Sequence, residues 1–239
     1  MNCIKTGFDE YDATFGGLEA GQLIVIAGRP AMGKSTLAMN IVHNVCVDKA
    51  NSVLVITPKK EGYYYCKRLI ELNPRDKISK CKLEVDDTKE VTVEYIDKRI
   101  AAMNQVSLVV IDYLQLMVGG KKSNGKRWAQ DKCILYGLKA LSKKYETPML
   151  VLSNLSRSCE DREDHRPRLT DLGEETEKIF DEIILLYRAD YYRRVDVQDD
   201  QEAEVIVVRH PCMEDIPKTI KLTYNCYAGG FTNRIHTRK

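Results

Sequence analysis

The segment Gly28-Arg29-Pro30-Ala31-Met32-Gly33-Lys34-Ser35 decides the fold of this chain. It fits the pattern G-x-x-x-x-G-K-[ST], follows the apolar run Leu23–Ala27 and precedes a helix-like stretch. Glycines let such a loop curl so that backbone N–H groups point at phosphates, and a helix N-terminus favours negative charge. We therefore predict a phosphate-binding loop in which Lys34 pairs with the β- and γ-phosphates and the Ser35 hydroxyl binds Mg²⁺. Thr36 is expected on the α-phosphate side.

Short apolar runs alternate with helix-length segments along the chain. The runs are Leu23–Ala27, Val53–Thr57, Leu108–Asp112, Met149–Ser153, Glu182–Tyr187, Glu204–Arg209 and Thr219–Tyr224. The helix-length segments are Ser35–Val47, Gly62–Leu72, Val91–Asn104 and Arg127–Tyr145. This alternation predicts an α/β fold with a mostly parallel, twisted sheet and helices on both faces. Pro211 and Pro217, between the last two runs, indicate a turn and hence an antiparallel hairpin at one edge of the sheet.

A second magnesium-side group is expected at the end of another strand. Asp112 directly follows four apolar residues, Leu108 to Ile111, and so fits this role. A carboxylate there orients the ion through its water shell. The alternative is an aspartate that only caps the strand.

Composition limits the function classes. The chain has 239 residues, and 37 Lys and Arg against 35 Asp and Glu give a net charge of +2, so any DNA binding must come from local loops. One domain covering residues 1–239 is the simplest organisation. No run approaches the roughly 18 apolar residues of a membrane span. The chain start shows no secretory signal, and the cysteines have no zinc spacing. These features favour a cytoplasmic protein.

Further strings lie in a fixed order around the phosphate loop. They are Thr6-Gly7-Phe8-Asp9, Gly16-Gly17-Leu18, Val110-Ile111-Asp112-Tyr113-Leu114-Gln115-Leu116-Met117, Ser153-Asn154-Leu155-Ser156-Arg157-Ser158, Asp171-Leu172 and Tyr187-Arg188. Together with the phosphate loop they resemble the C-terminal motor domain of the replicative DnaB-type helicases. The resemblance extends from about Thr6 to Phe231, nearly the whole chain.

This resemblance implies a RecA-like P-loop NTPase that uses ATP and Mg²⁺ and assembles as a homo-oligomeric ring around single-stranded DNA. Residues Gly28 to Thr36 would bind the nucleotide, and Gln115 matches a family position near the nucleotide and the subunit boundary. Asn154, where the family usually has Gln, would sense the γ-phosphate or its water. The family's N-terminal helical domain and linker helix are expected to be absent. The expected partners are therefore either further copies of this chain in a homo-oligomeric ring or a replicative helicase or primase.

The sequence departs from the family at two catalytic positions. Lys59 occupies the position of the catalytic glutamate, and a protonated lysine cannot accept a proton from the attacking water. Glu61 is the candidate substitute base if the loop takes another route; otherwise these residues form a solvated turn. The family's Lys-x-Arg finger aligns with Arg209-His210-Pro211, so that Arg209 would supply one cation to a neighbouring subunit and the second is lost.

The expected DNA-contacting stretch also departs from the family. It includes Asp171-Leu172-Gly173-Glu174-Glu175-Thr176-Glu177, which has Gly173 at a family arginine position and is acidic, and this opposes phosphate binding. The basic loop that contains Lys121, Lys122, Lys126 and Arg127 is the candidate DNA-binding element in compensation, with a merely soluble loop as the alternative.

Three hypotheses follow. The leading one is an ATP-dependent DnaB-like DNA helicase motor acting in DNA replication, with Lys34, Asp112, Glu61, Asn154 and Arg209 as catalytic candidates. The second is a degenerate paralogue that binds nucleotide and regulates or joins a replicative helicase without efficient hydrolysis. The third is a RecA-like recombination or strand-annealing mediator.

Overall fold

The computed structural model describes residues 3–47, 51–58, 62–71, 82–118, 127–173, 177–193, 201–225 and 230–234. The helices within these ranges are α1 (Asp9–Phe15), α2 (Lys34–Val47), α3 (Gly62–Glu71), α5 (Val93–Ala102), α6 (Arg127–Lys144) and α8 (Asp190–Arg193). The strands are β1 (Cys3–Ile4), β2 (Leu18–Glu19), β3 (Leu23–Gly28), β4 (Ser52–Ile56), β5 (Lys82–Asp86), β6 (Leu108–Ile111), β7 (Met149–Asn154), β8 (Glu182–Tyr187), β9 (Gln201–Arg209), β10 (Lys218–Asn225) and β11 (Gly230–Asn233).

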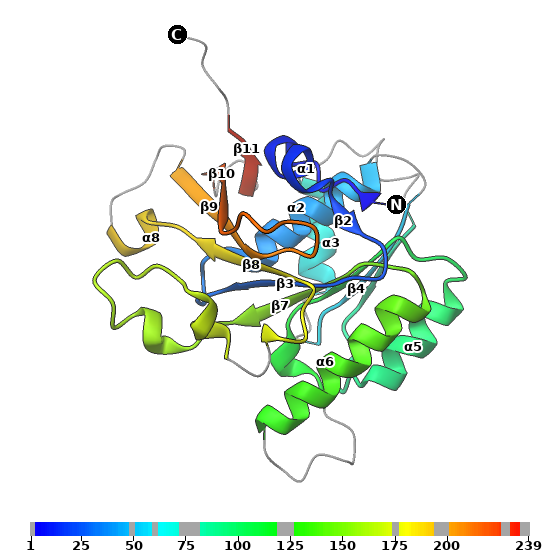
Figure 1. Ribbon diagram of the computed structural model, residues 1–239. Coiled ribbons are helices and arrows are strands. Elements are labelled where there is room, and N and C mark those ends of the chain that lie inside the picture. Colours follow the sequence, from blue (N-terminus) through cyan, green and yellow to red (C-terminus); the bar gives the residue numbers. More distant parts are fainter. Residues whose placement is uncertain are drawn as a thin grey trace.

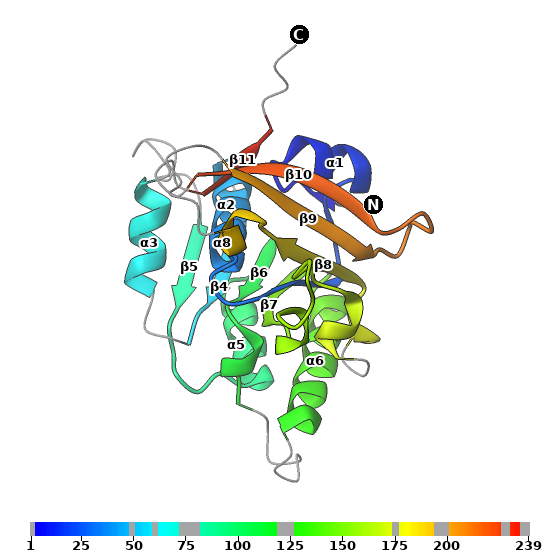
Figure 2. The same cartoon turned by 90° about the vertical axis from the view of Figure 1, so that its left-hand side faces the viewer.

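In the described residues, nine strands form one sheet in the order β11-β10-β9-β8-β3-β7-β6-β4-β5. The strands from β8 to β5 in this order run parallel to one another. Strands β9, β10 and β11 are each antiparallel to their neighbours and lie beside α1 and α2 (Figure 2). The predicted α/β fold and its antiparallel edge are therefore confirmed, and β11 extends the predicted hairpin by one strand.

Helices cover both faces of the sheet, with α1 and α2 on one side and α5 and α6 on the other (Figure 1). Strand β3 shows why its run of residues is apolar throughout: Ile24 and Ile26 enter the core under α2, whereas Leu23, Val25 and Ala27 enter the core under α6. All five side chains are fully buried. A strand covered on both faces is apolar at every position, which is typical of parallel sheets.

Two features of the sheet and its surroundings were not predicted. Strand β5 reads Lys-Leu-Glu-Val-Asp and lies at the sheet edge, so its alternating polar residues do not form an apolar run. Helix α1 is a short element that packs Tyr11 and Phe15 into the core. Among the described residues, no helix is long and apolar enough to cross a membrane.

A buried carboxyl group holds α1 against the sheet. The Tyr11 hydroxyl donates a hydrogen bond to Glu182 Oε1 at the start of β8, and the Glu182 side chain is fully buried. Burial raises the pKa of Glu182 to about 7, and the Tyr11 hydrogen bond only partly opposes this. The folded state therefore favours the protonated carboxyl, whereas the unfolded chain ionises at about pH 4.3.

We predict that this group makes the protein less stable as the pH rises from about 4.5 to about 7, by about 3 kcal/mol, with no further loss above that range. Glu182→Gln should remove this part of the pH dependence because its amide stays neutral. Urea unfolding at pH 5 and pH 8 measures the effect, with the exposed Glu202→Gln as the control. Equal pH dependence in the wild type and Glu182→Gln would contradict the assignment.

Candidate nucleotide site

The phosphate loop leaves the carboxyl end of β3 at Gly28 and enters α2 at Lys34. Strand register places Gly28 opposite Asn154, the last residue of β7. Gly33 has φ +98°, and a Cβ there would lie 2.9 Å from Phe231 Cζ. The tight approach of β11 and the positive φ both require glycine at this position. The predicted loop, strand and helix are thus present in the predicted order.

Lys34 lies within the curl of the loop. Its Nζ donates hydrogen bonds to the carbonyl oxygens of Gly28, at 2.8 Å, and Arg29, at 3.0 Å. Burial lowers the pKa of Lys34 to about 8, although the nearby negative charge of Asp112 opposes the shift. The buried lysine cation is thus bonded only to neutral carbonyl oxygens in this contact. An anionic ligand can take the place of these carbonyl groups as the hydrogen-bond partner of Lys34.

Asp112 directly follows β6 and is buried. Its Oδ2 accepts a hydrogen bond of 2.8 Å from the hydroxyl of Tyr65 on α3. Tyr65 is 1% exposed, whereas its neighbour Tyr63 is 80% exposed. Nothing in the run of three tyrosines connects Tyr65 with Asp112 at the level of sequence. The structure thus shows a carboxylate oriented by a buried hydroxyl, close enough to Lys34 to influence its pKa.

Gln115, which follows β6, contacts the residue that precedes Asn154 on β7. Gln115 lies in the short 3₁₀ helix Leu114–Leu116, and its Nε2 donates a hydrogen bond of 2.9 Å to Ser153 Oγ. Ser153 precedes Asn154 on β7. Asn154 is only partly buried and stands beside Gly28 at the mouth of the phosphate loop.

Several side chains of the phosphate loop point away from its mouth. Met32 is buried in the core under α2. Arg29 donates hydrogen bonds to Glu160 and to the carbonyl oxygen of Leu155. Pro30 and Ala31 are exposed, and Thr36 is buried. A nucleotide would therefore meet mainly the backbone of residues 28–33, with Lys34 and Ser35 as the side chains suited to phosphate and metal.

An aromatic cluster next to Gly33, in which only Tyr224 is partly exposed, was not predicted from the sequence. The Arg188 guanidinium lies 3.6 Å from the ring centroid of Tyr224, and the rings of Tyr224 and Phe231 are 4.9 Å apart. The nearest Tyr224 ring atom would be 3.8 Å from a Cβ on Gly33. Arg188 follows β8 and Tyr224 lies on β10, so only the strand order brings them together.

Arg209 lies at the other end of the sheet from the phosphate loop. It pairs with Ile183 near the start of β8, whereas the phosphate loop leaves the opposite end of the parallel strands. Its guanidinium donates a hydrogen bond to the carbonyl oxygen of Glu177. Within one chain, Arg209 is therefore not part of the same site as Lys34 and Asp112.

Some predicted residues lie outside the described part of the chain. These are Lys59 and Glu61 of the catalytic loop and Lys121, Lys122 and Lys126 of the basic loop. Arg127 begins α6, but the structure describes only its backbone. Among the described residues there is no cluster of three or more His, Cys, Asp or Glu side chains suited to a metal ion. Ser35 and Asp112 therefore remain the predicted metal-side groups, and they would need phosphate oxygens or water to complete a shell.

A phosphate loop on the central strand of this sheet, with a carboxylate after β6 and a polar residue after β7, defines an α/β P-loop ATPase domain of the RecA-like class. The family model described as "DnaB-like helicase C terminal domain" matches residues 3–75 and 66–233. The chain belongs to this family.

Known relatives agree with this assignment. The replicative DNA helicase DnaB of Geobacillus stearothermophilus is 31% identical over 234 residues, which cover 86% of this chain and 51% of the relative. DnaB of Buchnera aphidicola subsp. Baizongia pistaciae is 30% identical over 261 residues, 96% of this chain and 55% of the relative. The chain thus spans about half the length of the curated relatives it matches.

Solved structures show the same fold. A DnaB-like replicative helicase, described with its interactions with primase, superposes with a TM-score of 0.87 at 28% identity, covering 98% of this chain and 64% of the other. A separately solved ATPase domain gives the same TM-score and identity and covers 98% of this chain and 92% of that domain. The RadB recombinase, at a TM-score of 0.67 and 16% identity, covers 97% of this chain and all of its own, and shares the fold alone.

The lowered pKa of Lys34 predicts a pH-dependent affinity for Mg·ADP. Phosphates favour the charged amine, so its pKa rises on binding, and above about pH 8 the free protein must take up a proton to bind. The affinity should therefore fall by up to about tenfold per pH unit above pH 8 and change little through this group near pH 7. Titration calorimetry measures this.

Lys34→Arg is the control, because a guanidinium stays charged throughout this range. Its affinity, whatever its absolute value, should not show the decline above pH 8. If both proteins lose affinity equally between pH 8 and pH 9.5, Lys34 is not the titrating group.

Proposed function

We propose that this chain binds Mg·ATP and is the ATPase motor of a DnaB-like replicative helicase acting on single-stranded DNA. The proposal rests mainly on one observation: Lys34, Asp112 and Asn154 lie together at the carboxyl ends of the parallel strands. Strand register places Gly28 beside Asn154, and the negative charge of Asp112 is close enough to act on the pKa of Lys34. The rest of the site is consistent with a nucleoside triphosphate.

The residues present fit the phosphates and the metal. The first backbone N–H groups of α2 lack intrahelical partners, which makes this helix start suitable for an anion. Lys34 would exchange two carbonyl partners for phosphate oxygens. The Ser35 hydroxyl and Asp112 would hold Mg²⁺, with Tyr65 fixing the orientation of the carboxylate. The ion would neutralise charge on the phosphates. Lys34 and Ser35 begin α2 shortly after β3, and Asp112 follows β6, so these three residues lie at the carboxyl ends of the strands.

The partly exposed Tyr224 ring beside the loop suits the base. Tyr224 is partly exposed and lies next to Gly33. The buried Arg188 guanidinium, which also pairs with Asp190, lies over the Tyr224 ring. An aromatic ring in this position is a good stacking partner for a purine. In this proposal the base lies at the β8–β10 side of the phosphate loop.

Hydrolysis would need groups from more than one chain. Asn154 would hold the γ-phosphate or the attacking water through its amide. Arg209 is too far along the sheet to act in its own site, and we assign it to the site of a neighbouring subunit. This arrangement requires an oligomer, as a ring or with a replicative helicase or primase as the partner.

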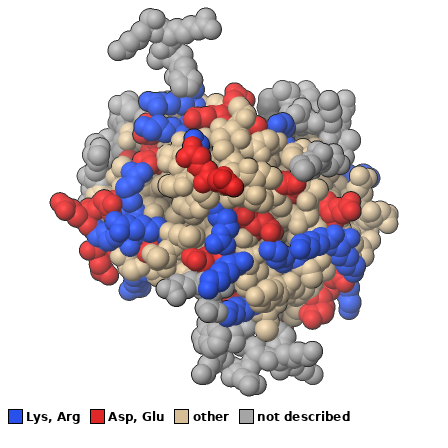
Figure 3. All heavy atoms as spheres, in the orientation of Figure 1, with Lys and Arg blue, Asp and Glu red and all other residues tan. Residues whose placement is uncertain are grey.

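DNA binding would depend on local loops. Basic and acidic side chains are interspersed over the face shown in Figure 3. A net charge of +2 gives little long-range attraction for DNA. We therefore assign DNA contact to the basic loop that contains Lys121, Lys122, Lys126 and Arg127.

The alternative is a nucleotide-binding paralogue that regulates or joins a true helicase. It is favoured by Lys59 at the position of the family's catalytic glutamate and by Pro211 at that of a finger cation. Loss of one finger cation alone costs about 10³-fold or more in turnover. The buried lysine and carboxylate of the phosphate site are present in either case.

ATP turnover with and without single-stranded DNA separates these functions, with Lys34→Ala as the blank. The motor hypothesis predicts turnover that DNA stimulates and that falls by about 10²-fold or more in the blank, because the cation that neutralises the phosphates is gone. Asp97→Asn, at a surface ion pair with Lys144, is the matched control and should turn over normally. ATP binding without turnover would support the regulatory alternative. Equal binding and turnover in Lys34→Ala would refute both.

A further inference from the structure

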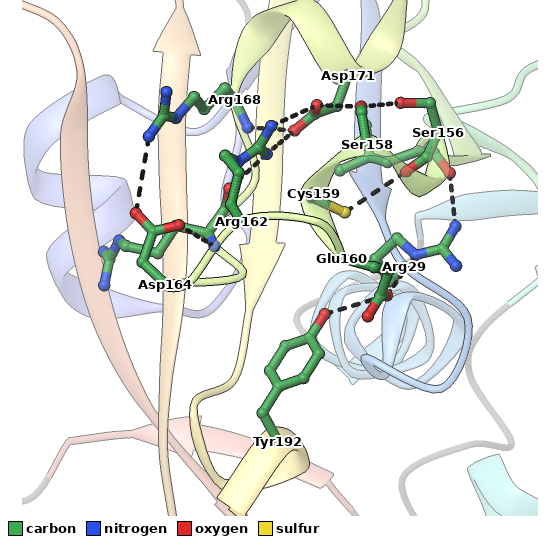
Figure 4. A network of polar contacts seen from close by, with 12 residues as sticks. Arg29, Ser156, Ser158, Cys159, Glu160, Arg162, Asp164, Arg168, Asp171 and Tyr192 are labelled. Carbon is green, nitrogen blue, oxygen red and sulfur yellow. Dashed lines mark hydrogen bonds and ion pairs between the residues drawn. The ribbon is translucent and has the colours of Figure 1, made fainter.

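The chain after β7 folds into a compact polar unit around one buried carboxylate, which we call the 155–173 segment (Figure 4). Asp171 is 3% exposed and accepts hydrogen bonds from Ser158 Oγ at 2.7 Å, Arg168 N at 2.7 Å and Arg162 Nη1 at 3.0 Å. Ser156 N also donates to the carbonyl oxygen of Asp171, at 3.0 Å. These contacts join both ends of the segment to one another.

Arg29 of the phosphate loop forms hydrogen bonds with this segment. Arg29 Nε lies 2.7 Å from Glu160 Oε1, and its Nη1 donates to the carbonyl oxygen of Leu155 at 2.9 Å. Glu160 Oε1 also lies 3.3 Å from the hydroxyl of Tyr192 on α8. Figure 4 shows the Glu160 carboxylate between the Arg29 guanidinium and the Tyr192 ring. Tyr192 in turn stacks on His165 of the segment, with ring centroids 4.3 Å apart.

The pair is well shielded on the arginine side. The Arg29 side chain is 16% exposed and that of Glu160 is 35% exposed. Hydrogen bonding to Arg29 holds the pKa of Glu160 below its usual range, so the carboxylate stays ionised near neutral pH. A charge-assisted contact that is partly removed from water constrains geometry more than an exposed pair does.

Arg29 is held at both ends. Its carbonyl oxygen accepts a hydrogen bond from Lys34 Nζ at 3.0 Å, while its guanidinium holds Glu160. A phosphate that draws Lys34 Nζ toward itself must compete with the bond to the Arg29 carbonyl. Arg29, whose carbonyl oxygen would lose this bond, is also the residue whose side chain contacts Glu160 and Leu155 of the 155–173 segment.

We propose that the Arg29–Glu160 pair transmits nucleotide occupancy from the phosphate loop to the 155–173 segment, with Glu160 as a positioning residue. The inference rests on the proposed nucleotide binding and adds a mechanical role that the site itself does not require.

Hydrogen exchange of peptides from residues 155–173, with and without saturating Mg·ADP, tests the coupling. Glu160→Gln removes the charge and keeps the shape of the side chain, and calorimetry gives its Mg·ADP affinity. The matched control is Glu204→Gln, because Glu204 on β9 pairs with Arg166 of the same segment, whereas Glu160 pairs with Arg29 of the phosphate loop. Arg29→Lys is a second variant, which keeps a charge but loses the two-pronged contact.

In the wild type and in Glu204→Gln, Mg·ADP should change exchange in the segment. In Glu160→Gln and Arg29→Lys, that change should shrink by about tenfold. The Mg·ADP affinity of Glu160→Gln should stay within about tenfold of the wild type. A merely structural role would alter exchange equally with and without nucleotide.

A full nucleotide-dependent change in Glu160→Gln would overturn the proposal. So would a wild type that binds Mg·ADP with no change in the segment, and this outcome leaves the proposed function intact. A wild type that does not bind Mg·ADP overturns the proposed function and the coupling together.

Discussion

The parallel pairing of β3 with β7, and of β7 with β6, is the constraint on which the site depends. Because the strands are parallel, their carboxyl ends lie side by side, with Gly28 opposite Asn154 and Ile111 opposite Val151. Asp112 follows Ile111 directly, so three separate stretches of sequence converge without any contact specific to the ligand. Apolar cores on both faces fix this register, because the strands are buried on each side. Ligand chemistry is thus placed by hydrophobic burial.

The buried polar groups of the site have partners within the protein. Lys34 is bonded to loop carbonyls, and Asp112 to Tyr65. Anionic phosphates stabilise a buried cation better than neutral carbonyl groups do. Phosphate binding is therefore linked to a change in the hydrogen bonds of Lys34. The Arg29–Glu160 pair extends this link beyond the loop. In this proposal, nucleotide binding affects the 155–173 segment through the side chain of Arg29.

Much of the fold was predictable because its signals are local. The apolar run of β3 and the phosphate-loop pattern occupy consecutive residues, and Asp112 ends an apolar run. Edge strand β5 was missed because its polar residues alternate with apolar ones. The contacts of Tyr65, of Arg188 with Tyr224 and of Arg29 with Glu160 could not be predicted, since each joins residues from separate elements. The sequence shows which residues are charged or aromatic. Which of these residues contact one another depends on how the strands and helices are arranged in the fold.

The most direct test of this account is a crystal structure of the chain with Mg·ADP. The account predicts phosphates against the backbone of residues 28–36, Lys34 Nζ moved from the carbonyl oxygens of Gly28 and Arg29 to phosphate oxygens, and the metal on the side of Ser35 and Asp112. The base should contact Arg188 or Tyr224. Nucleotide bound elsewhere, or Lys34 still bonded to the loop carbonyls with ADP present, would contradict it.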